Sequence, residues 1–136
     1  MIELIIALPI LIFVAMGMAE FGQYFYIKNA FQSAARSAAR VACVASALQS
    51  DPATAATNAL SYAGVTFNSS WMLIIDLSSG SLVTDVSTIP PGHIFTVIIQ
   101  QTYDQLPNVY RPLYQITGQG IKNGKQLVGQ TTTVKE

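Results

Sequence analysis

Residues 1–18 read MIELIIALPILIFVAMGM and contain one charged side chain, that of Glu3. An α-helix of this length spans about 27 Å, which is close to the roughly 30 Å hydrocarbon core of a bilayer. The stretch therefore predicts a helix that can cross a membrane. Pro9 lies inside it, and because proline lacks a backbone donor the helix can bend there.

The helical pattern continues from Ala19 to about residue 48 without another proline. Small and apolar residues line one side of this part, as in an amphipathic helix that packs closely on its neighbours. Four polar residues recur at intervals of four and share another side: Lys28, Gln32, Arg36 and Arg40. We expect one helix of about 70 Å over residues 1–48. The rest of the chain is too short to cover it.

The remainder of the chain changes from a helical to an alternating pattern. Asp51 and Pro52 predict the start of a short helix, which Gly64 ends. Alternation then predicts strands near residues 70–77 and 94–103. The stretch SLVTDV at 81–86 is a possible further strand between them, and a β-prone stretch follows at 126–136. One face of the first strand carries Trp71, Leu73, Ile75 and Leu77, and one face of the second carries Phe95, Val97, Ile99 and Tyr103.

The expected fold is α+β: a long hydrophobic N-terminal helix, then a short helix and a small antiparallel β-sheet. We expect two parts in one chain. Residues 1–48 form the helix, and residues 49–136 form a small globular domain. The globular part is polar but poor in charge, which suits an extracytoplasmic surface or one that packs against identical neighbours.

Composition excludes several classes of function. Seven basic and seven acidic residues cancel, and a neutral chain lacks the positive charge that nucleic-acid binding needs. One Cys and one His leave no Cys-based zinc site and little scope for His-centred catalysis. No nucleophile–base pair, phosphate loop or metal-ligand spacing is present in the sequence. We therefore expect no enzyme, no cofactor, no metal and no nucleic-acid partner.

The N-terminal motifs resemble those of TadE-like pilins and pseudopilins of the tight-adherence (Tad) system. The resemblance is carried by Glu3 and Pro9 in a hydrophobic helix, and by Glu20-Phe21-Gly22 with the aromatic residues Tyr24 and Tyr26 after it. The Ala-rich, Arg-containing stretch QSAARSAARVAC at 32–43 is similar to the family's next segment. The likeness is specific over residues 2–42 and only suggestive beyond them.

This resemblance implies a structural subunit of an extracellular, type IV pilus-like filament at the cell surface. Such subunits polymerise through the N-terminal helix into a homo-oligomeric helical filament that serves surface attachment. The implied partners before assembly are the inner membrane, a prepilin peptidase that removes a short leader, and the pilus assembly machinery. The alternatives are a minor TadE-like pseudopilin and a membrane-anchored pilus assembly factor.

Glu3 is the candidate assembly residue, because a carboxylate inside an apolar helix is costly unless it is paired. Its expected partner is an N-terminal amine of the same or an adjacent subunit. The alternative is a first-turn carboxylate that favours the helix dipole. Glu20 is expected either in a filament core or at an interface with its carboxylate in water. The residues expected to pack in a helix bundle are Ile5, Leu8, Pro9, Leu11, Phe13, Met16, Glu20, Phe21 and Tyr24.

Overall fold

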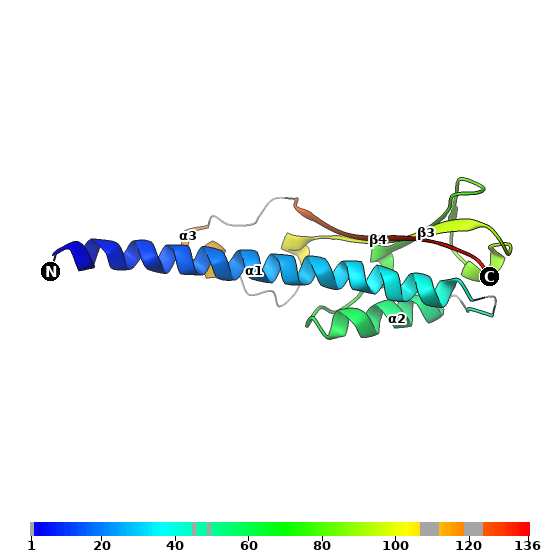
Figure 1. Cartoon of the computed structure of the whole chain (residues 1–136), viewed down its shortest axis with the longest axis horizontal. Coiled ribbons are helices and arrows are strands. Elements are labelled where there is room, and N and C mark those ends of the chain that lie inside the picture. The colour runs from blue at the N-terminus through cyan, green and yellow to red at the C-terminus, as the bar shows by residue number, and fades with distance from the viewer. Residues whose placement is uncertain (1, 45, 49, 107–111, 119–123) are drawn as a thin grey trace.

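The computed structural model describes residues 2–44, 46–48, 50–106, 112–118 and 124–136. Its longest element is α1 (Ile2–Ala42), which projects far beyond the other elements at its N-terminal end (Figure 1). At about 1.5 Å per residue this helix is about 60 Å long. It continues through Pro9. The predicted long hydrophobic helix is confirmed.

The end of α1 differs from the expectation, because the helix stops at Ala42 rather than near residue 48. Lys135 lies at the other end of the chain and is buried there. Its Nζ donates to the carbonyl oxygens of Ala42 at 2.9 Å and Val44 at 2.8 Å. The N–H of Glu136 donates to the carbonyl of Cys43 at 2.9 Å. These bonds satisfy carbonyls that a longer helix would have bonded internally.

α2 (Ser50–Ser61) packs beside the C-terminal half of α1 (Figure 1). It ends as predicted at Gly64, whose φ of 71° is a left-handed conformation that favours glycine. The N–H of Gly64 donates to the carbonyl of Ser61, and that of Val65 donates to the carbonyl of Leu60. This pair of bonds is a Schellman motif, which satisfies the last carbonyls of the helix.

The predicted antiparallel sheet is present and has four strands in the order β2-β1-β3-β4. The strands are β1 (Met72–Asp76), β2 (Ser81–Val83), β3 (Ile94–Thr102) and β4 (Gln126–Val134). The short helices are η1 (Ser69–Trp71), η2 (Val86–Thr88), η3 (Tyr103–Gln105) and α3 (Pro112–Thr117). β4 forms one edge of the sheet and the shorter β2 forms the other.

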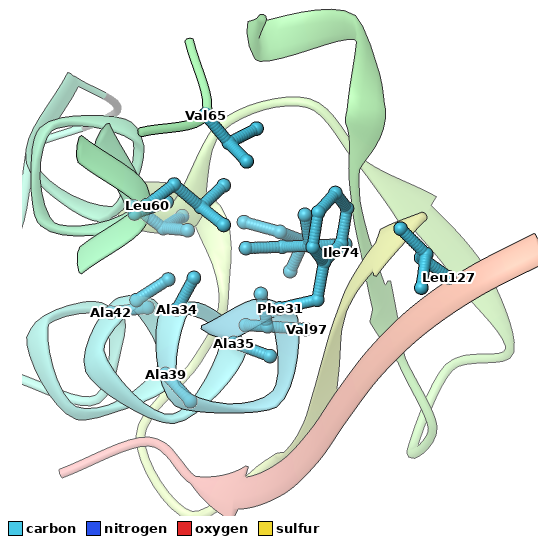
Figure 2. Packing of buried hydrophobic residues seen from close by; sticks show 14 of the residues in the cluster. Phe31, Ala34, Ala35, Ala39, Ala42, Leu60, Val65, Ile74, Val97 and Leu127 are labelled. Atoms are coloured by element: carbon cyan, nitrogen blue, oxygen red, sulfur yellow. The ribbon is translucent and has the colours of Figure 1, made fainter. Parts of the chain in front are cut away.

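The core lies between α1, α2 and one face of the sheet. Phe95, Val97, Ile99 and Tyr103 are fully buried, which confirms the predicted face of β3. On β1 the buried side chains are Ile74 and Asp76, so the grouping of Trp71, Leu73, Ile75 and Leu77 is not the core face of that strand. Figure 2 shows Phe31 of α1 beside Ile74, and the alanines of α1 between Leu60 of α2 and the sheet. Alanine allows this close approach of helix to helix and helix to strand.

Candidate functional site: an exposed apolar stem

We name residues 2–19 of α1 the stem, and the rest of the described fold the head. The stem exposes large apolar side chains on all its sides, with Ile5 70%, Leu11 67% and Met18 69% exposed. Contiguous apolar patches of more than a few hundred Å² are rare on monomeric soluble proteins and mark an interaction surface. The stem therefore needs lipid or other protein chains around it.

α1 is long and apolar enough to cross a membrane, and it is the one such helix in the described ranges. A core helix of a soluble protein can have the same length and composition, but its side chains are then buried by its own fold. In this chain the apolar end of the helix projects away from the head (Figure 1). The helix thus suggests membrane anchoring.

Apart from Glu20, the residues predicted for helix packing fall into two groups in the structure. Met16 and Tyr24 are half-buried, and the ring of Tyr24 meets that of Tyr103 edge to face at 5.3 Å between centroids. Most of the other predicted residues are available to a neighbouring chain because they are exposed: Ile5, Leu8, Pro9, Leu11, Phe13 and Phe21. Their packing in a bundle remains a prediction, because the structure contains one chain.

Glu20 marks the point at which α1 enters the head. It is 1% exposed, and the next buried residues of α1 are Ile27 and Phe31. The carboxylate is therefore buried within a single chain rather than placed in water. Of the residues predicted for helix packing, it is the one least accessible to a neighbour.

Glu3 lies exposed in the first turn of α1, where a carboxylate interacts favourably with the helix dipole. Met1 lies outside the described residues. Pairing of Glu3 with an amine of the same or another copy therefore stays a prediction. Glu3 is the one charged residue among residues 1–19, so we still expect its partner in an apolar bundle to be an N-terminal amine of the same or an adjacent subunit.

The sequence did not reveal the role of Asp76, which is buried beneath the turn between β1 and β2. His93 Nδ1 lies 2.9 Å from Asp76 Oδ2. The hydroxyl of Ser79 donates to Oδ2 at 2.8 Å, and the N–H of Ser78 donates to Oδ1 at 2.9 Å. The bond with His93, followed by those from Ser79 and Ser78, lowers the pKa of Asp76 from 3.8 to about 2.

This cluster braces the start of β3 against the turn and has no catalytic geometry. The Ser79 hydroxyl donates to the carboxylate instead of facing the imidazole, whereas a nucleophilic serine needs a base as its direct partner. Within the described ranges, no three His, Cys, Asp or Glu side chains are grouped so as to hold a metal ion. The signal in the sequence was weak, since only tertiary contact joins residues 17 positions apart.

The comparisons with curated proteins and with solved structures gave no significant match. A family model for TadE-like proteins matches residues 1–40. The match contains Glu3, Pro9 and the Glu20-Phe21-Gly22 motif, and it ends before α2 and the sheet. The predicted resemblance is confirmed for the stem and most of the covered part of α1: residues 1–40 of this chain are similar to TadE-like proteins.

Proposed function

We propose that the chain is a structural subunit of a Tad-type, type IV pilus-like filament. The stem anchors the subunit in the inner membrane before assembly and packs against the stems of other copies afterwards. One observation carries the proposal: the stem is apolar on all sides and is left exposed by its own head. The family match over residues 1–40 supports it.

In a helical polymer of many copies, the stem of each subunit is surrounded by other stems once it has left the membrane. Burial of apolar surface contributes about 25 cal/mol per Å², so each stem that leaves the bilayer regains its burial against other stems. The chain has a net charge of zero, which limits repulsion between closely packed copies. The same arrangement would place the heads on the filament surface outside the cell, where attachment to surfaces occurs.

The proposed partners are copies of this chain, the inner membrane, a prepilin peptidase and the pilus assembly machinery. We propose no catalytic role, cofactor or nucleic-acid partner. The Asp76 cluster has a sufficient structural explanation in the turn that it braces.

Shearing of intact cells that express the chain tests the proposal. We expect the chain in membrane-free filaments recovered from the medium, with a second pool in the inner membrane. The alternative of a membrane-anchored assembly factor predicts that the whole pool stays in membranes. A minor pseudopilin predicts filaments in which this chain is present only in trace amounts. Either result would contradict the role as the repeating subunit.

Glu3→Ala tests the assembly residue separately. The variant should reach the membrane, because the stem becomes more apolar, but it should give few filaments. Glu3→Asp is the matched control, since it keeps a carboxylate at the same position and should retain assembly. A normal filament yield from Glu3→Ala would show that the carboxylate is not needed.

A further inference from the structure

The β4 edge of the sheet is a long strand whose own sequence carries no protection against pairing with another strand. β4 has nine residues, QLVGQTTTV, and contains neither a charged residue nor a proline. Edge strands of this kind present unpaired N–H and C=O groups and are templates for strand addition. Natural proteins commonly block them with lysine, proline, a bulge or a covering element.

The side chain of Gln32 in α1 forms hydrogen bonds with the backbone of β4 near the middle of this edge. Its Nε2 donates to the carbonyl of Gln130 at 2.8 Å, and its Oε1 accepts from the N–H of Gln130 at 3.3 Å. One side-chain amide thus supplies the donor and the acceptor that a residue of a neighbouring strand would supply. Gln130 lies opposite Ile98 of β3. Because its N–H and C=O bond to Gln32, these two groups point away from the existing sheet.

Two further contacts hold α1 along the same edge. Glu136 is an even number of residues from Gln130, so its N–H points the same way, and it donates to the carbonyl of Cys43. Gly129 lies directly against the backbone of α1, and a Cβ at that position would clash with the carbonyl of Phe31. Between these points the side chain of Gln32 hydrogen-bonds to the β4 backbone.

We propose that Gln32 keeps the β4 edge closed against strand addition by β4 of a second copy. An uncharged strand whose exposed side chains are Gln, Val and Thr can pair antiparallel with an identical strand, because no like charges are brought together. When Gln32 is absent, the outward N–H and C=O of Gln130 are free for such pairing. The proposal concerns the head alone and does not depend on filament formation.

The test compares the full-length protein in detergent micelles with Gln32→Ala and with Asn29→Ala. Asn29→Ala is the matched control, since it removes an exposed amide from the same helix. Loss of the Gln32 bonds should speed hydrogen exchange of the Gln130 amide by a factor of about 5–30 in dilute protein. Sedimentation at rising protein concentration should then show dimers of Gln32→Ala only.

A third variant identifies the surface. Gln130→Lys added to Gln32→Ala places a lysine on the proposed strand edge and should restore the monomer. The proposal is overturned if Gln32→Ala stays monomeric like the wild type, or if its dimers persist when Gln130→Lys is added. If circular dichroism shows that Gln32→Ala does not fold, Gln32→Glu replaces it in the same measurements, because it keeps an acceptor for the Gln130 N–H but no donor for its carbonyl.

Discussion

Lys135 joins the end of β4 to the end of α1 across 93 residues of sequence. Its ammonium donates to two carbonyls in a position that water does not reach. Lys135→Met keeps much of the apolar stem of the side chain but leaves those carbonyls unsatisfied. We expect the variant to lose about 1.5–3 kcal/mol of unfolding free energy, the range for hydrogen bonds that involve a charged group.

Urea unfolding of the full chain in detergent, followed by circular dichroism, measures this loss. Lys125→Met is the control, because Lys125 is an exposed lysine just before β4. Its stability should stay within about 0.5 kcal/mol of the wild type, as for most surface substitutions. Equal effects of the two substitutions would contradict the role assigned to Lys135.

Asp76 makes the unfolding free energy of the head decrease as the pH falls into the acid range. Because its pKa is lowered from 3.8 to about 2, the ionised form stabilises the native state above pH 3.8, and this contribution is lost as the pH falls to about 2. Asp76→Asn cannot ionise. The difference in unfolding free energy between wild type and variant should therefore be largest above pH 4 and should shrink toward pH 2.

Denaturation curves for both proteins across this pH range give the difference directly, and the contributions of the other carboxylates cancel in it. A gap between wild type and Asp76→Asn that stays constant from pH 5 to pH 2 would show that the charge of Asp76 does not stabilise the fold.

Contact between α1 and β4 depends on a missing side chain at Gly129. Gly129→Ala would force the strand away from the carbonyl of Phe31 and would strain the bonds between Gln32 and Gln130. Overpacking of this kind costs about 1–3 kcal/mol. Gly22→Ala is the opposite case, since a Cβ there meets nothing within 4 Å and alanine favours a helix.

Thermal unfolding should therefore show a lower midpoint for Gly129→Ala and an equal or higher one for Gly22→Ala. A midpoint of Gly129→Ala at or above that of the wild type would mean that the helix and the strand have room to separate without loss of stability.

The elements with local signals were predictable from the sequence. The apolar run of α1, the alternation of β3 and the glycine at the end of α2 each follow from residues within a few positions. The end of α1 was not predictable, because Lys135 and Glu136 determine it from the far end of the chain. The core face of β1 was obscured because a buried carboxylate, Asp76, stands where an apolar residue would signal burial.

At the scale of the whole molecule, the head and the stem differ in how they accommodate their apolar residues. The head buries its apolar residues around Phe31 (Figure 2), whereas the stem, which projects from the head in Figure 1, leaves its own exposed. The candidate site was predictable as a stretch of sequence, since its residues are contiguous. The position of Glu20 inside the head was not, because its burial depends on segments far along the chain.

The central claim is that the stem lies in the core of a filament, and cysteine labelling of sheared, membrane-free filaments tests it most directly. In a Cys43→Ser background, Leu11→Cys places a thiol on the stem and Ser81→Cys places one on the exposed first residue of β2 in the head. A water-soluble maleimide should label Ser81→Cys in intact filaments and Leu11→Cys only after the filaments are dissociated. Equally fast labelling of both thiols, or the absence of the chain from the sheared material, would contradict the account.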